Sequence, residues 1–169
     1  METFYPGCEA GADLSAKAVF VDLDETFLEG TVVNMTDEEL EAAEIKYRTL
    51  SLIMSAVSKG IPVIMVTRNN HTMIDRFFNA KPYLRGLFKE LIPCPIGPKS
   101  GPIKAYMEQN GISPKQAIFL DDTSVELDDV RKNVEGILAT HPDTADMISL
   151  DGEADILESR RRMKILLAA

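Results

Sequence analysis

The stretch from Ala18 to Gly30 constrains the fold more than any other part of the chain. It opens with four apolar residues in a row and then places carboxylates at Asp22 and Asp24. An apolar run without polar alternation is typical of a strand covered on both faces, as in a parallel sheet. Side chains two residues apart on a strand point the same way, and open α/β sheets bind ligands at the carboxyl ends of their strands. We therefore expect both carboxylates at a ligand-binding edge.

Two carboxylates at this spacing repel each other. The repulsion raises a carboxyl pKa unless a cation lies between the two groups. Either a divalent metal ion or a shared proton is therefore expected at Asp22 and Asp24. A buried strand that runs into an acidic turn is also common in proteins where the turn has no function. Residues elsewhere in the chain are therefore needed to distinguish a functional site from an ordinary turn.

Predicted strands and helices alternate along the chain. Helical patterns separate the apolar runs, and this alternation predicts an α/β fold with a doubly wound parallel sheet. The expected strands are 18–21, 61–66, 90–96, 116–120 and 136–140, and the expected helices are 36–60, 72–80, 84–89, 99–110, 125–133 and one from about 153.

The first interval between strands contains one long predicted helix. Thr36 and Glu39 form a capping-box pattern, and Gly60 provides a C-terminal stop. We expect the apolar stripe of this helix to pack on the sheet, and a contact with a second copy of the chain, which would make a homo-oligomer, is the alternative. Residues 27–35 suit a small hairpin or flap beside the carboxylates. The stripe consists of Leu40, Ala43, Tyr47, Leu50, Met54 and Val57.

Length and composition narrow the class of protein. The 169 residues are expected to form a single domain, 1–169, with 1–17 as a loose lead-in. The net charge of −9 disfavours nucleic acid and anionic membranes as partners, and no apolar run is long enough to span a membrane. Cys8 and Cys94 have no metal-site or redox spacing, and no signal peptide is evident, so we expect a cytoplasmic protein.

Chemically active side chains follow two more of the predicted strands. Thr67 ends the second strand, Asp121 and Asp122 follow the fourth, and Lys99 begins the helix before the fourth strand. Carboxylates are the hard oxygen ligands that Mg²⁺ prefers, whereas Thr and Lys supply donors for phosphoryl oxygens. Because the carboxyl ends of parallel strands share one edge, these groups predict a phosphoryl-transfer site.

Residues 18–140 resemble the haloacid dehalogenase superfamily, whose signature has four motifs in a fixed order. The matching elements here are D-x-D-x-T at 22–26, then Thr67, Lys99 and Asp121-Asp122. The resemblance implies a Rossmannoid core and a Mg²⁺-dependent phosphatase that works through an aspartyl-phosphate. Asp22 would be the nucleophile, and Asp24 the general acid and base. Thr67 and Lys99 would bind the phosphoryl group, and the metal site would consist of Asp22, Asp24 through its backbone carbonyl, Asp121 and Asp122.

The sequence offers alternatives for the phosphate-binding lysine, the metal ligands and the function. Lys104 is an alternative to Lys99, and either Asp121 alone or both neighbouring acids bind the metal, with Glu126 as a further candidate. A catalytically silent module that recognises phosphorylated partners is the alternative function. The family's usual cap domains have no counterpart of comparable length here, so we expect an open site for a phosphorylated small molecule or an exposed phosphate on a macromolecule.

Basic residues gather in one part of this acidic chain. We predict that they form a rim that steers an anionic substrate, and solvated helix faces are the alternative. The residues concerned are Arg68, Arg76, Lys81, Arg85, Lys89, Lys99 and Lys104.

Overall fold

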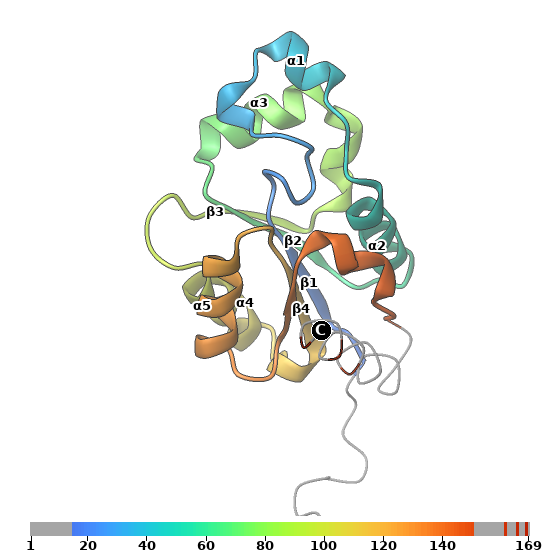
Figure 1. Cartoon of the computed structure of the whole chain (residues 1–169), viewed down its shortest axis with the longest axis vertical. Coiled ribbons are helices and arrows are strands. Elements are labelled where there is room, and N and C mark those ends of the chain that lie inside the picture. Colours follow the sequence, from blue (N-terminus) through green and yellow to red (C-terminus); the bar gives the residue numbers. More distant parts are fainter. Residues whose placement is uncertain (1–14, 151–160, 162–164, 166–167, 169) are drawn as a thin grey trace, which may run out of the picture.

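The computed structural model describes residues 15–150 together with residues 161, 165 and 168. The predicted lead-in up to residue 14 and the body of the helix predicted from 153 lie outside these residues. A five-stranded parallel sheet forms the centre, as predicted (Figure 1), and the structure gives its strand order as β3-β2-β1-β4-β5. No helix in the described part of the chain is long and apolar enough to cross a membrane. The strands are β1 (Ala18–Val21), β2 (Val63–Thr67), β3 (Glu90–Pro93), β4 (Ala117–Leu120) and β5 (Leu138–Thr140).

Helices cover both faces of the sheet, as a doubly wound fold requires. The helices are α1 (Asp37–Ala42), α2 (Tyr47–Ser58), α3 (His71–Ala80), α4 (Ser100–Gln109) and α5 (Ser124–Asn133). Four 3₁₀ helices complete the described elements: η1 (Val32–Asn34), η2 (Pro82–Leu87), η3 (Pro114–Gln116) and η4 (Pro142–Met147).

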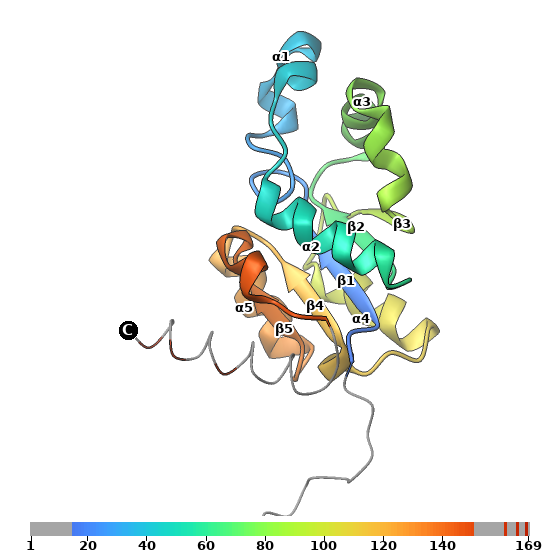
Figure 2. The ribbon, with the colours of Figure 1, turned by 90° about the vertical axis from the view of Figure 1, so that its right-hand side faces the viewer.

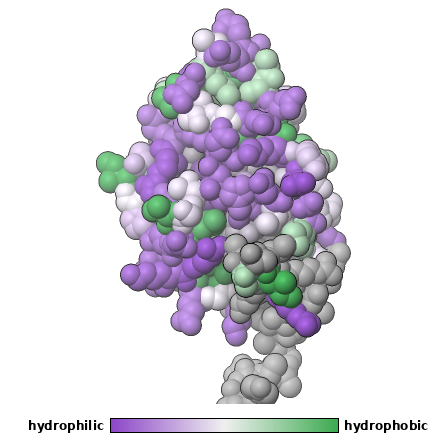
Figure 3. All heavy atoms as spheres, in the orientation of Figure 1, coloured by the Kyte–Doolittle hydropathy of each residue, from purple (hydrophilic) through white to green (hydrophobic). Residues whose placement is uncertain are grey.

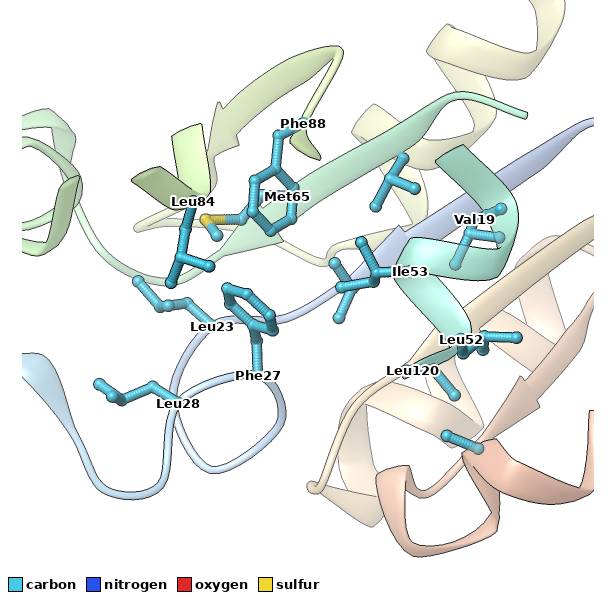
Figure 4. Close-up of a cluster of buried hydrophobic side chains, with 14 of the residues drawn as sticks. Val19, Leu23, Phe27, Leu28, Leu52, Ile53, Met65, Leu84, Phe88 and Leu120 are labelled. Carbon is cyan, nitrogen blue, oxygen red and sulfur yellow. The ribbon is translucent and has the colours of Figure 1, made fainter. Parts of the chain in front are cut away.

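The alternation of side chains along β1 divides the core into two clusters. Val19 and Val21 pack with α2, α3 and η4, whereas Ala18 and Phe20 pack with α4 and α5. Figure 4 shows the first cluster, in which Phe27 and Leu23 from the segment after β1 lie near Met65 and Phe88. These apolar anchors fix the course of the chain immediately beyond the strand.

The long helix predicted over 36–60 is wrong, because the chain is extended between α1 and α2. Ile45 pairs with Leu28 in an isolated antiparallel bridge, and the Glu29 amide donates to the Glu44 carbonyl at 2.9 Å. The helix therefore restarts at Tyr47 with a different face inward, and Tyr47 itself is 71% exposed. Met54 and Val57 are exposed too, and the buried residues of α2 are Thr49, Leu52, Ile53 and Ala56.

Of the hairpin or flap predicted over 27–35, the hairpin is also wrong. The amides of Phe27 and Leu28 donate to the Leu23 carbonyl at 3.0 and 2.9 Å, which closes a tight turn directly after β1. The β-prone residues that follow form η1 instead of a strand. The Val32 amide, at the start of η1, donates a hydrogen bond to the Asp24 side chain.

Helices α1 and α3 stand side by side beyond the carboxyl ends of the strands (Figure 2). The Thr36–Glu39 capping box predicted from the sequence is present, with both reciprocal hydrogen bonds. Arg76 of α3 donates to the Asp37 carboxylate at 2.8 Å and to the Met35 carbonyl at 2.8 Å. Polar contacts therefore join α1 to α3 within this small projecting unit.

Candidate active site

The candidate site lies where β1 and β4 end. The chain runs from β1 to β2 and β3 on one side of the sheet, then crosses to β4 and β5 on the other. Open α/β sheets bind ligands at such a switch point. The register pairs Val21 with Leu120, so Asp22 and Asp121 are neighbours just beyond the two strands.

The alternation of side chains explains why the acids share one face. Phe20 of β1 and Phe119 of β4 both pack on the α4–α5 side of the sheet. Asp22 and Asp121 follow each of them by two residues and so point to the same side. Asp22 is 6% exposed and Asp121 is fully buried.

Lys99 lies between these two acids. Its Nζ is 2.9 Å from Asp22 Oδ1 and 2.6 Å from Asp121 Oδ2, and the residue is only 1% exposed. Lys99 is the N-cap residue of α4, which packs on the same side of the sheet, and its side chain therefore lies at the strand ends. Lys104, the alternative weighed from the sequence, is exposed on α4.

Burial and charge act in opposite directions on these groups. Burial raises the pKa of Asp22 to about 7, against the attraction of Lys99 and with some help from the repulsion of Asp121. Burial lowers the Lys99 pKa, but the two acids outweigh it and hold that pKa above its ordinary value. One lysine therefore does not fully compensate the buried acids, and a further cation would be favoured here.

Asp122 completes a set of three carboxylates. Single oxygens of Asp22, Asp121 and Asp122 all lie within 4.8 Å of one another. Thr26 fixes Asp122, since the Asp122 amide donates to Thr26 Oγ1 at 3.0 Å and that hydroxyl donates to the Asp122 carboxylate at 3.3 Å. Ligands of one octahedral Mg²⁺ lie roughly 3 to 4 Å apart. Small side-chain rotations would therefore place these hard oxygens on one ion.

Asp24 is held from two directions beside this set. Val32 N donates to its Oδ1 and Asn69 Nδ2 to its Oδ2, both at 2.8 Å. Asn69 also donates to Thr67 Oγ1, from its side chain at 2.9 Å and from its amide at 3.2 Å. Because the Thr67 oxygen accepts both of these bonds, its own hydrogen is free to serve a further acceptor.

Asn69 and Thr26 were not among the residues assigned to the site from the sequence. Asn69 joins Thr67 to Asp24, and Thr26 joins Asp122 to the turn after β1. The signal for Thr26 was its place in D-x-D-x-T. The only signal for Asn69 was its position two residues after Thr67, in a polar turn that also contains the N-cap of α3, Asn70.

Glu126 lies outside the carboxylate set. Its Oε1 accepts from Arg68 Nε at 2.7 Å and from a second nitrogen of the same guanidinium. Arg68 also donates to the carbonyls of Cys94 and Gly97. The carboxylate that the sequence left as a further metal candidate is therefore committed to an arginine.

The basic residues between 68 and 104 do not form a free rim. Arg68 pairs with Glu126, Arg76 pairs with Asp37, and Lys99 pairs with the site acids. Lys81 is buried and donates to the Glu41 carbonyl. Four of the seven residues therefore have partners within the chain, Lys99 among the site acids, whereas Arg85, Lys89 and Lys104 remain exposed.

Comparison with known proteins finds matches by structure only. No family model and no curated protein matches the sequence. The magnesium complex of the N-terminal part of BF1531 from Bacteroides fragilis, which contains a phosphatase domain, matches with a TM-score of 0.66 and 18% identity. The match covers 86% of this chain but 40% of that structure.

Two further matches span most of both chains. The haloacid dehalogenase-like hydrolase SP0104 from Streptococcus pneumoniae has a TM-score of 0.54 and 13% identity, over 86% of this chain and 91% of its own. The enzyme BT-2542 from Bacteroides thetaiotaomicron, in complex with magnesium and inorganic phosphate, has a TM-score of 0.53 and 16% identity, over 84% and 98%. The chain therefore has the fold of the haloacid dehalogenase-like hydrolases.

Proposed function

We propose that this chain is a Mg²⁺-dependent phosphohydrolase that cleaves a phosphomonoester through an aspartyl-phosphate on Asp22. One observation carries the proposal: Lys99 is buried between Asp22 and Asp121, with Asp122 beside them. Burying charge is costly, and an acid held at a pKa of about 7 is a typical mark of a functional site.

Asp22 has the role of nucleophile in this scheme. Its carboxylate oxygen attacks phosphorus, and the bond to the leaving oxygen breaks in line. Asp24 lies two residues further along, fixed by Val32 and Asn69, and protonates the leaving oxygen. Asp24 then takes a proton from the water that cleaves the aspartyl-phosphate, which restores both carboxyl groups.

Thr67 and Lys99 hold the phosphoryl oxygens. The Thr67 hydroxyl has a hydrogen to give, because Asn69 occupies its oxygen as an acceptor. Lys99 supplies positive charge at the same edge. Asp22, Asp121, Asp122 and the Asp24 backbone carbonyl would hold the Mg²⁺ ion. When bound, the ion would supply positive charge that favours the ionised form of Asp22 and offsets the charge of the phosphoryl oxygens.

The proposed substrate is a phosphorylated small molecule or an exposed phosphate on a macromolecule. Among the described residues, the connection from β1 to β2 adds only η1 and α1 before the helix that packs on the sheet. This supports a single catalytic domain over 1–169 without a large cap, and hence an open site. The face seen in Figure 3 is mainly hydrophilic, with apolar residues in separate small patches.

Hydrolysis of an aryl phosphate tests the proposal. The wild-type chain should release phenolate in Mg²⁺ and lose that activity in EDTA, with recovery when Mg²⁺ is restored. Asp22→Asn should reduce kcat by about a thousandfold or more, because the amide is not a nucleophile. Asp128→Asn, an exposed acid of α5, is the matched control and should keep full activity.

Two results would refute the enzymatic assignment. Activity that survives Asp22→Asn would place the nucleophile elsewhere. No hydrolysis with any divalent metal, together with binding of a phosphorylated ligand, would support the silent module instead.

A further inference from the structure

Arg68 connects three segments that each lead directly to a proposed site residue. Thr67 is its neighbour in the chain, Gly97 lies two residues before Lys99, and Glu126 lies in the first turn of α5, four residues after Asp122. The guanidinium bonds to Glu126 Oε1 at 2.7 Å through Nε and to the Gly97 carbonyl through Nη1. One side chain therefore spans the ends of β2, β3 and β4.

The loop over residues 94–98 has few other tethers. Its residues 95–98 are exposed, and Gly97 has a φ of 85°, which favours glycine. The Cys94 amide donates to the Thr67 carbonyl at 2.7 Å, and the Cys94 thiol lies 3.7 Å from the carbonyls of Ile96 and Gly97. Arg68 makes the contact between this loop and the α5 segment that carries Glu126.

Lys99 directly follows that loop, at the N-cap of α4. Its Nζ has to reach past the strand ends to lie within 3 Å of Asp22 and Asp121 while the residue stays 1% exposed. At the other side of Lys99, the Ser100 amide donates to the Asp129 carboxylate at 3.2 Å. The segment that carries Lys99 is thus fixed at both sides to α5, by Arg68 and by Asp129.

We propose that Arg68, with Glu126, is a positioning pair that holds Lys99 in place against Asp22 and the acids after β4. The guanidinium would act through these contacts and not on the substrate itself, since Glu126 and two carbonyls take four of its hydrogen bonds. The effect of the positioning pair on catalysis rests on the proposed function. The effect of the pair on the exposure of Lys99 does not.

Arg68→Gln tests the pair, and Arg131→Gln is the matched control. Arg131 is also partly exposed and lies in the last turn of α5, whereas Glu126 lies in the first turn. It donates to the Asp128 carboxylate at 3.2 Å and to the Ala139 carbonyl at 2.7 Å. Labelling by an amine-reactive reagent, read by peptide mass spectrometry, should modify Lys99 at least several-fold faster in Arg68→Gln. The Arg131→Gln variant should label like the wild type.

Kinetics give the second measurement. Misplacement of a catalytic group by about 1 Å can cost about a hundredfold. We expect kcat for an aryl phosphate to fall about 10- to 100-fold in Arg68→Gln, with a smaller change in KM. Glu126→Gln, which keeps an acceptor for the guanidinium, should have an intermediate kcat, and the double variant should be no worse than Arg68→Gln alone.

The outcomes separate the two proposals. Faster Lys99 labelling without any phosphatase activity in the wild type would keep the positioning pair and refute the proposed function. Unchanged Lys99 labelling in a folded Arg68→Gln, or equal changes in Arg131→Gln, would overturn the positioning pair. If Arg68→Gln does not fold, the labelling rate of Lys99 in Glu126→Gln decides.

Discussion

The buried environment of Asp22 raises the pKa of its carboxyl group and makes the ionised form costly for the stability of the folded protein. Burial holds its pKa at about 7 although Lys99 lies 2.9 Å away. In the metal-free protein the folded state therefore binds this proton more tightly than the unfolded chain does. The free energy of unfolding should accordingly fall as the pH rises from about 4 to about 7, since stability decreases wherever the native state binds more protons.

Asp22→Asn should therefore stabilise the metal-free protein above pH 7. We expect the free energy of unfolding at pH 8 in EDTA to rise by about 1 to 3 kcal/mol, because each pKa unit corresponds to about 1.4 kcal/mol. Urea unfolding of both proteins measures this, and the gap should narrow near pH 4, where wild-type Asp22 is protonated. Asp75→Asn, on the exposed face of α3, should change stability by less than about 0.5 kcal/mol. A less stable Asp22→Asn at pH 8 would contradict the account.

The main candidate site residues could be predicted from the sequence, but the residues that hold them in place could not. The strand ends predicted Asp22, Thr67 and Asp121 as candidate site residues, because parallel strands bring their carboxyl ends together. Asn69 and Arg68 make contacts over sequence separations of 45 and 58 residues, to Asp24 and to Glu126. No local pattern specifies such pairs, so they became visible only in the fold.

At the scale of elements, α1 depends on α3 for its place. Arg76 donates to the Asp37 carboxylate and the Met35 carbonyl, and buried Lys81 donates to the Glu41 carbonyl at 3.0 Å. A helix of six residues is too short to be stable alone. The polar contacts with α3 therefore supply much of what keeps it folded.

Arg76→Gln tests this arrangement against the steering hypothesis. Amide exchange over residues 32–42 should accelerate about 5- to 30-fold, as expected from the loss of about 1 to 2 kcal/mol of charge-assisted hydrogen bonding. KM for an aryl phosphate should change by less than about twofold, because Asp37 already neutralises the guanidinium. Arg85→Gln, whose guanidinium donates to the Phe88 carbonyl, is the control and should leave exchange over 32–42 unchanged. A large, salt-dependent rise in KM without faster exchange would restore the steering role.

The break between α1 and α2 shows where periodicity fails as a guide. Residues from Leu40 to Val57 keep helical spacing without glycine or proline, so the sequence predicted one helix. The extended bridge of Ile45 with Leu28 competes with that helix and wins, because it pairs the chain with the turn after β1. The Thr49 hydroxyl then donates to the Thr26 carbonyl at 2.7 Å, which turns a polar residue inward. Tertiary contacts of this kind override local propensity.

For the whole molecule, sheet topology determines the site. The order β3-β2-β1-β4-β5 puts β1 at the centre and makes its end adjacent to that of β4. Two acidic turns almost a hundred residues apart thus meet with Lys99 between them. The alternation of strands and helices was enough to predict this meeting, because parallel strands leave few alternative arrangements.

Acid-quenched peptide mapping of Asp24→Asn tests the central claim most directly. An aryl leaving group needs little protonation, so this variant should still form the aspartyl-phosphate but hydrolyse it slowly for lack of a base. In Mg²⁺ we predict a burst of about one phenolate per chain, with the phosphoryl group on the peptide that carries Asp22, and no labelled peptide in EDTA. Turnover with the phosphoryl group on any other residue, or a burst without a phosphoryl group on Asp22, would contradict the account.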